Sequence, residues 1–253
     1  MFDNKIKKRL KSGDAVIGSF ITCNSPDLIE IMGLAGFDFI VIDTEHGPLS
    51  IETTVDLIRA AELRGLTPIT RVTNTMESTI LRTLDVGAHG IQVPQVYNST
   101  IARQIVKSSK YFPIGNRGLA MPRSSDYGIH PPIDYFKHTN KETMIVLHCE
   151  NRESLDNLEE IAQIPEIDVI FLGPFDMSQS LGIPGQVHHP LIKDAAEKVV
   201  DICRKNNIAP GIFVSSGEEA RNKIQSGFQY ITIGMDTSLF YQACLKEIKS
   251  IKK

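Results

Sequence analysis

The sequence predicts an α/β fold, a closed (β/α)8 TIM barrel. Eight short runs rich in Val, Ile and Phe recur along the chain. Most of them are followed by a longer stretch of helical periodicity, an alternation typical of parallel sheets covered by helices. The chain has 253 residues, the usual length of one barrel, and no linker-like stretch divides it. We therefore expect a single domain over residues 1–253.

The predicted strands are the eight apolar runs themselves. They cover residues 15–21, 38–42, 68–71, 90–93, 144–149, 168–172, 209–213 and 230–234. An open, doubly wound sheet would show the same alternation, but the chain has no early G-x-G-x-x-G motif. Eight repeats favour closure into a barrel.

Helices are predicted between the strands. They cover residues 26–35, 51–64, 75–84, 100–109, 152–163 and 218–226. The first has clear boundary signals, since Ser25 precedes Pro26 at its start and Gly36 follows its end. One segment, residues 111–141, is rich in Gly, Pro, Arg and His and is too long for a plain connection. Such segments are usually functional lids or disordered, and its position is left open.

Composition and charge favour a small-molecule partner. The chain carries 27 basic and 30 acidic residues, a net charge of −3, and no basic patch that would indicate nucleic-acid binding. It has no apolar run of membrane-spanning length and no signal-peptide core near its start. Its four cysteines lie far apart, which indicates reduced thiols. We expect a cytoplasmic protein that does not bind membranes.

Charged residues follow several of the predicted strands. Glu45 and His46 come after the second strand, Arg71 ends the third, Glu150 follows the fifth, and Asp176 follows the sixth. Because the carboxyl ends of barrel strands meet at one rim, where the active sites of such barrels lie, these side chains are predicted to cluster. That rim is the predicted active site.

Glu150 and Asp176 are predicted metal ligands. Two hard oxygen ligands leave positions for water and a bidentate substrate, as Mg²⁺ and Mn²⁺ sites often do, and a 2-oxo acid could chelate such a metal. Either carboxylate alone could equally cap a following helix. Their positions after neighbouring strands favour the metal site.

Arg71 and His46 are predicted to act on the substrate. A guanidinium at the barrel mouth can bind a carboxylate or stabilise an enolate oxygen, although an ion pair with Glu45 is the alternative. His46 could transfer protons near neutral pH, and Asp85, in the turn before the fourth strand that is expected to face the mouth, could assist it if the chain path allows contact. No predicted strand ends in lysine, so Schiff-base chemistry is disfavoured and aldol chemistry would depend on a metal.

The chain resembles the HpcH/HpaI aldolases, class II pyruvate aldolases that cleave 4-hydroxy-2-oxo acids into pyruvate and an aldehyde. The resemblance covers nearly the whole sequence. Its motifs are Gly36-Phe37-Asp38, Ile42-Asp43-Thr44-Glu45-His46, Arg71, Leu84-Asp85-Val86-Gly87, Val93-Pro94, Asn116-Arg117-Gly118, Glu150, Gly173-Pro174-Phe175-Asp176-Met177-Ser178 and His189-Pro190.

The resemblance implies a role for each of the rim residues. Glu150 and Asp176 would bind the divalent metal, which would be Mg²⁺, Mn²⁺ or Co²⁺. Arg71 would stabilise the enolate, and His46 with Asp85 would form a dyad that assists proton transfer. The expected partner is a small 2-oxo acid.

The resemblance also implies substrate contacts and an assembly. Gly173 and Phe175 would contact the pyruvate unit through backbone amides, and the chain would form a homo-oligomer, a dimer or a hexamer of dimers that exchange the last helix, residues 237–251. Two positions depart from the family: His148 replaces a common Gln, and Phe175 replaces Ala. His148 could coordinate the metal, bind substrate, titrate, or be a tolerated polar exchange.

Three functions remain to be distinguished. The first is a metal-dependent carbon–carbon lyase that forms pyruvate and an aldehyde through an enolate. The second is a condensing synthase that joins an oxaloacetate-type 2-oxo acid to an acyl-thioester. The third, a barrel that binds a ligand without catalysis, is opposed by the full set of predicted rim residues, Arg71, His46, Glu150 and Asp176.

Overall fold

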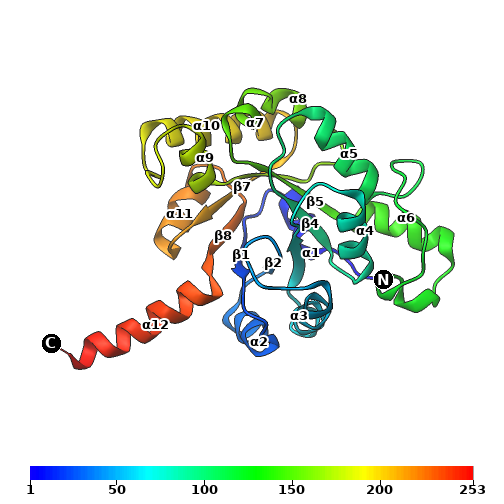
Figure 1. Ribbon diagram of the computed structural model, residues 1–253, viewed down its shortest axis with the longest axis horizontal. Coiled ribbons are helices and arrows are strands. Elements are labelled where there is room, and N and C mark those ends of the chain that lie inside the picture. The colour runs from blue at the N-terminus through cyan, green and yellow to red at the C-terminus, as the bar shows by residue number, and fades with distance from the viewer. Residues whose placement is uncertain (253) are drawn as a thin grey trace.

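The computed structural model describes residues 1–252 and contains a closed barrel of eight parallel strands in chain order. Figure 1 shows the barrel inside a ring of helices. The strands are β1 (Val16–Ile21), β2 (Phe39–Asp43), β3 (Thr67–Arg71), β4 (Gly90–Val93), β5 (Met144–Cys149), β6 (Val169–Leu172), β7 (Ala209–Val214) and β8 (Tyr230–Met235). The predicted barrel is confirmed, and every predicted strand boundary agrees to within one residue.

The six predicted helices are present on the outside of the barrel. They are α2 (Pro26–Ala35), α3 (Ile51–Leu63), α4 (Glu77–Asp85), α5 (Ser99–Ser109), the pair α7 (Arg152–Asp156) and α8 (Leu158–Ala162), and α11 (Gly217–Gln225). The boundary signals of α2 are confirmed: the Ser25 side chain accepts from the Leu28 N–H, and Gly36 ends the helix with φ of +95°. The predicted helix over residues 152–163 is wrong as one piece, because it breaks at Asn157.

Within residues 1–252 the structure contains five further α-helices, four of which the sequence did not predict. They are α1 (Lys5–Lys11), α6 (Pro132–Glu142), α9 (Pro174–Ser180), α10 (Pro190–Lys205) and α12 (Asp236–Ile251), of which only the last was expected, as residues 237–251. Helix α1 closes the lower end of the barrel, since Ile6 and Leu10 pack in the same buried cluster as the inward-facing Val16 and Phe39. No helix among residues 1–252 is long and apolar enough to cross a membrane.

The segment over residues 111–141 is folded and lies at the lower end of the barrel. It contains the 3-10 helix η1 (Arg123–Gly128) and α6. The His138 Nε2 lies 2.7 Å from the Phe2 carbonyl oxygen, and Tyr135 is buried. Figure 1 places α6 beside the N-terminus. The segment is therefore not a lid over the carboxyl ends of the strands within this chain.

Candidate active site

Four of the five predicted rim residues line a pocket at the carboxyl ends of the strands, and the fifth, Arg71, is not in that lining but contacts Glu45, which is. The pocket has a volume of about 230 Å³, and its lining includes Glu45, His46, Gln95, Glu150 and Asp176. Glu45 and His46 follow β2, Glu150 follows β5, and Asp176 lies in the first turn of α9, after β6. The parallel barrel thus brings together residues that are 130 positions apart in the chain.

Glu150 and Asp176 border one small gap above Gly173. A Cβ atom added to Gly173 would lie 3.2 Å from Glu150 Oε2 and 3.8 Å from Asp176 Oδ2, so both oxygens face the same space. Among residues 1–252 no group of three or more His, Cys, Asp or Glu could enclose a metal ion. Two carboxylates with room beside them fit a hard divalent cation whose remaining ligands are water and substrate.

The Glu150 carboxylate is fixed on both sides. Its Oε1 accepts the Gln95 N–H at 2.7 Å, and its Oε2 lies 2.5 Å from His148 Nδ1. The backbone of Gln95 has φ of +56°, a left-handed conformation that is uncommon for residues other than glycine. Burial disfavours the charged carboxylate, but His148, the Gln95 N–H and Arg71 together hold the pKa of Glu150 below its usual range.

Arg71 is buried and is oriented chiefly by Asp43. Its Nε and Nη2 donate to the two Asp43 carboxylate oxygens at 2.8 and 2.5 Å, and its guanidinium lies 4.7 Å from the centre of the Phe20 ring. The ion pair with Glu45 that the sequence offered as an alternative is also present, at 3.4 Å. Burial disfavours the charge on Asp43, but Arg71 keeps the pKa of that carboxyl below its usual range.

His46 lies beside Glu45 at the solvent side of the pocket. The imidazole is largely exposed, and its Nε2 lies 3.9 Å from Glu45 Oε2. Burial, together with the nearby negative charge of Glu150, raises the pKa of Glu45 in spite of Arg71. An exposed imidazole beside such a carboxyl can exchange protons between solvent and the pocket.

Asp85 does not meet His46 within one chain. It is the last residue of α4, and its Oδ1 accepts from Arg117 Nη2 at 2.7 Å. The expectation that the turn before the fourth strand faces the mouth is wrong, because α4 runs back along β3 and ends where β4 begins. The dyad of His46 and Asp85 therefore stays a prediction, because the two residues are not in contact within one chain.

The remaining predicted residues lie at different depths. Phe175 is 52% exposed at the rim, and its ring packs edge-on against Phe213 at 6.0 Å. The Gly173 N–H already donates to the Cys149 carbonyl, over a long 3.3 Å. His148 is buried inside the barrel, against Phe171.

Four residues near the site were given no role by sequence reasoning. They are Asp43, Gln92, Gln95 and Tyr230. Asp43 and Gln95 lie close to the ends of β2 and β4, so the rule that located the other rim residues could have found them. Gln92 and Tyr230 face each other across the barrel interior, and single-sequence patterns carry no signal for such a pair.

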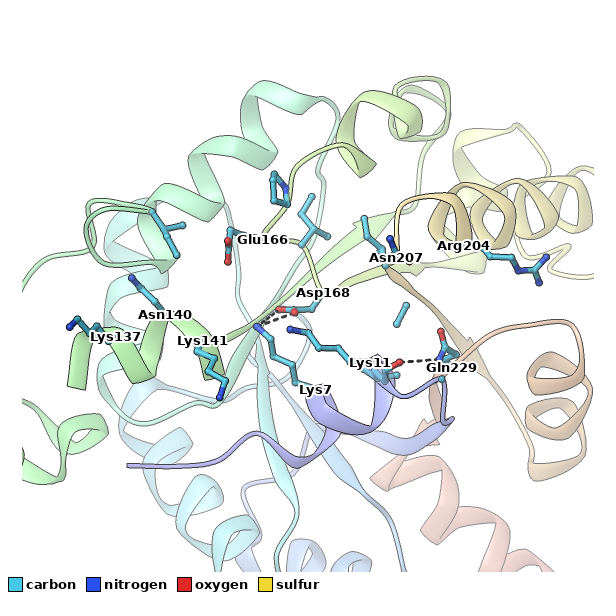
Figure 2. A pocket seen from close by; sticks show the side chains of 17 residues that line it. Lys7, Lys11, Lys137, Asn140, Lys141, Glu166, Asp168, Arg204, Asn207 and Gln229 are labelled. Carbon is cyan, nitrogen blue, oxygen red and sulfur yellow. Dashed lines mark hydrogen bonds and ion pairs between the residues drawn. The ribbon is translucent and has the colours of Figure 1, made fainter. Parts of the chain in front are cut away.

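A larger cavity, of about 710 Å³, lies at the opposite end of the barrel. Figure 2 shows its polar lining, with Lys7 and Lys11 from α1 near Asp168. Lys7 Nζ lies 3.0 Å from Asp168 Oδ1, an ion pair between α1 and the start of β6. Because active sites of such barrels lie at the carboxyl ends of the strands, the smaller pocket is the candidate active site.

A closed parallel barrel with paired carboxylates and a buried arginine at its carboxyl rim defines a TIM-barrel enzyme. The chain belongs to the HpcH/HpaI aldolase/citrate lyase family, whose sequence model matches residues 16–243. The resemblance seen in the motifs is thereby confirmed.

Several relatives match along nearly their whole length. The chain is 32% identical to a 5-keto-4-deoxy-D-glucarate aldolase of Enterobacter sp. (strain 638), over 100% of this chain and 98% of that protein. It is 31% identical to a 4-hydroxy-2-oxo-heptane-1,7-dioate aldolase of Escherichia coli, over 95% and 92%. The crystal structure of the citrate synthase SbnG matches with a TM-score of 0.88 and 32% identity, over 97% and 96%. The relatives named aldolases identify the chain as an enzyme of the carbon–carbon lyase class.

Proposed function

We propose that this enzyme cleaves a 4-hydroxy-2-oxo acid to pyruvate and an aldehyde in a reversible, metal-dependent aldol reaction. The observation that carries the proposal is the gap above Gly173, which is bordered by one oxygen each of Glu150 and Asp176. Relatives named as aldolases of 2-oxo or keto acids support the substrate class.

Glu150 and Asp176 would bind the metal, for which Mg²⁺, Mn²⁺ and Co²⁺ are the candidates. A bound divalent cation supplies Lewis-acid stabilisation for negative charge on a 2-oxo group. Glu150 is suited to the role because the pKa of its carboxyl lies below the usual range, so it is ionised at neutral pH.

Arg71 would stabilise the enolate. Asp43 binds its Nε and Nη2, and the ring of Phe20 supports its flat face, so the guanidinium is oriented before substrate arrives. A donor that needs no reorientation during the reaction stabilises developing charge more effectively than a mobile one. His46, exposed beside Glu45, would accept the proton of the 4-hydroxyl group.

The sequence of the barrel strands disfavours a Schiff-base mechanism. None of the eight strands contains a lysine, and the buried Lys7 and Lys110 lie at the opposite end of the barrel. An imine would need an amine beside the substrate carbonyl. The enolate therefore requires another source of stabilisation at this rim.

The first test is deuterium exchange into the methyl group of pyruvate, followed by NMR. Metal-stripped protein would be supplied with Mg²⁺, Mn²⁺ or Co²⁺ in D₂O. We expect metal-dependent exchange in the wild type and a loss of at least 100-fold in Glu150→Ala and Arg71→Ala, since one preorganised donor contributes about 10²- to 10³-fold.

Matched controls are Glu159→Ala and Arg59→Ala, which remove the same side chains from exposed helix positions. Both should exchange at the wild-type rate. Absence of exchange with every metal would contradict the pyruvate-lyase proposal.

A condensing synthase is the second candidate. It is supported by the 32% identity with the citrate synthase SbnG and by His148 at a position where aldolases of the family commonly have Gln. Product analysis distinguishes the two candidate functions. One reaction would contain oxaloacetate and an acyl-thioester, and the other would contain pyruvate and an aldehyde. A condensation product from the first pair alone would favour the synthase.

A further inference from the structure

A chain of buried hydrogen bonds crosses the barrel interior and ends on Glu150. The Tyr230 hydroxyl donates to Gln92 Oε1 at 3.0 Å. The amide nitrogen of Gln92 lies 2.8 Å from His148 Nε2, and His148 Nδ1 lies 2.5 Å from Glu150 Oε2. The four side chains come from β8, β4 and β5 and the residue after β5, and all four are buried.

The donors in this series of hydrogen bonds all point in one direction, from Tyr230 toward Glu150. Tyr230 is fully buried, which raises the pKa of its phenol well above the usual value, so its hydroxyl remains a donor. Once Gln92 Oε1 accepts that hydrogen, the amide NH₂ of Gln92 faces His148. Nε2 of His148 must then accept, and the ring proton belongs on Nδ1, where it faces Glu150.

Aromatic packing fixes the two ring members of the chain. Tyr230 stacks on Phe39 with 4.2 Å between ring centres, and His148 stacks on Phe171 at 5.0 Å. Reversing the direction of the hydrogen bonds would leave the buried Tyr230 hydroxyl hydrogen without its partner, Gln92 Oε1, and a lost hydrogen bond inside the barrel is costly. The direction from Tyr230 to Glu150 leaves every member satisfied.

We propose that Tyr230, Gln92 and His148 are positioning residues that orient the Glu150 carboxylate for metal binding. This inference rests on the proposed function. His148 occupies one lone pair of Oε2, and the Gln95 N–H occupies one of Oε1. These two hydrogen bonds fix the orientation of the Glu150 carboxylate and therefore the direction of its remaining lone pairs. Both ring nitrogens of His148 already have hydrogen-bond partners, so neither is free to coordinate the metal or to bind substrate.

The main test is calorimetric titration of Mn²⁺ into the metal-stripped full-length protein. Loss of an outer hydrogen-bond partner typically weakens metal binding 10- to 100-fold. We expect a loss in that range for His148→Phe, which keeps the stacking but removes the donor. His148→Gln should recover most of the affinity, because an amide can still donate to Glu150.

Tyr230→Phe removes a single oxygen two side chains away from Glu150. We expect it to weaken Mn²⁺ binding about three- to tenfold, an estimate scaled down from the effect of a direct partner. The matched control is Tyr111→Phe, since Tyr111 is equally buried and its hydroxyl has no partner within residues 1–252. That control should bind Mn²⁺ like the wild type.

Nitrogen-15 NMR of the His148 ring gives a readout that general stabilisation would not change. We expect the Nδ1–H tautomer in the wild type and in Tyr111→Phe, and a mixture of tautomers in Tyr230→Phe. An Nε2–H tautomer in the wild type, or unchanged Mn²⁺ affinity in both Tyr230→Phe and His148→Phe, would overturn the inference. If His148→Phe does not fold, Tyr230→Phe and His148→Gln decide. Failure of the wild type to bind Mn²⁺ would count against the proposed function instead.

Discussion

Arg71 and His148 show how polar side chains are accommodated inside this barrel. A buried charge or imidazole is costly unless its hydrogen-bonding groups have partners. Arg71 has Asp43 and Glu45, and His148 has Gln92 and Glu150. In both cases the partners also determine where the functional group points, so burial and positioning have the same cause.

Phe175 is the residue whose replacement should change the choice of acceptor. Its ring is half exposed at the rim and is the neighbour of the proposed ligand Asp176. A difference of one methylene group in an apolar pocket changes selectivity by about 10- to 200-fold. We expect Phe175→Ala to raise kcat/KM for bulky aldehydes about tenfold relative to acetaldehyde, measured in the condensation direction with pyruvate.

Phe112→Ala serves as the control for this change, because Phe112 is another exposed phenylalanine and lies in the segment at the lower end of the barrel. It should leave the ratio between aldehydes unchanged. If Phe175→Ala also leaves the ratio unchanged, Phe175 does not contact the acceptor.

At the scale of the elements, the strands were the most predictable part of the sequence. Parallel strands buried on both faces are continuous apolar runs, so their ends are easily recognised. Helix α1 was missed because five basic residues conceal the Ile6 and Leu10 pair that closes the barrel. Helix α10 was missed although Ile192, Val199 and their buried neighbours recur at helical spacing.

The site was predictable only as far as strand ends reveal it. The clustering of Glu150, Asp176 and His46 is predictable because each follows a strand, and all three border the same pocket. The contact between Gln92 and Tyr230 joins β4 to β8, which are not adjacent in the barrel. Such a contact depends on which side of each strand faces inward and on the barrel's diameter, neither of which the sequence states.

Helix α12 is the element expected to mediate assembly. Figure 1 shows it extending away from the barrel, and Phe240, Tyr241 and Ile248 are exposed along it. An exposed apolar surface of this kind usually marks a protein interface. We expect the wild type to form a homo-oligomer through α12 and the double variant Phe240→Asp, Tyr241→Asp to dissociate into smaller species, measured by light scattering after size-exclusion chromatography.

Lys246→Glu on the same helix is the control, since it changes the charge of α12 without removing an apolar side chain. It should keep the wild-type mass. Equal masses for all three proteins would show that this apolar surface does not hold the assembly together.

Across the whole molecule, the two ends of the barrel differ in charge and in role. The carboxyl end carries Glu45, Glu150 and Asp176 around the proposed metal site. The lower end carries the cavity of Figure 2, whose cations are Lys7, Lys11, Lys137, Lys141 and Arg204. In barrels of this type the lower end serves stability, so changes there should affect unfolding rather than catalysis.

Lys110 tests that division through the pH dependence of stability. Its Nζ is buried and donates to the Asn140 and Thr143 carbonyl oxygens at 2.7 and 2.8 Å. Burial, reinforced by Lys7, lowers the pKa of Lys110 from 10.5 to about 8. Between these values the unfolded chain binds one more proton than the folded protein, so the free energy of unfolding rises with pH in this window and the cost of the buried charge is greatest below about pH 8.

We expect the free energy of unfolding of the wild type, minus that of Lys110→Met, to rise between pH 8 and 10.5 by on the order of 3 kcal/mol. Urea denaturation at a series of pH values measures this difference, and subtraction of the variant removes the titration of all other groups. Lys137→Met replaces an exposed lysine at the same end of the barrel and should show no such rise relative to the wild type. Because neither lysine lies near the carboxyl rim, both variants should retain the deuterium exchange of pyruvate at pH 7. A flat difference for Lys110→Met would mean that water reaches the ammonium and that the lower end is more open than its packing indicates.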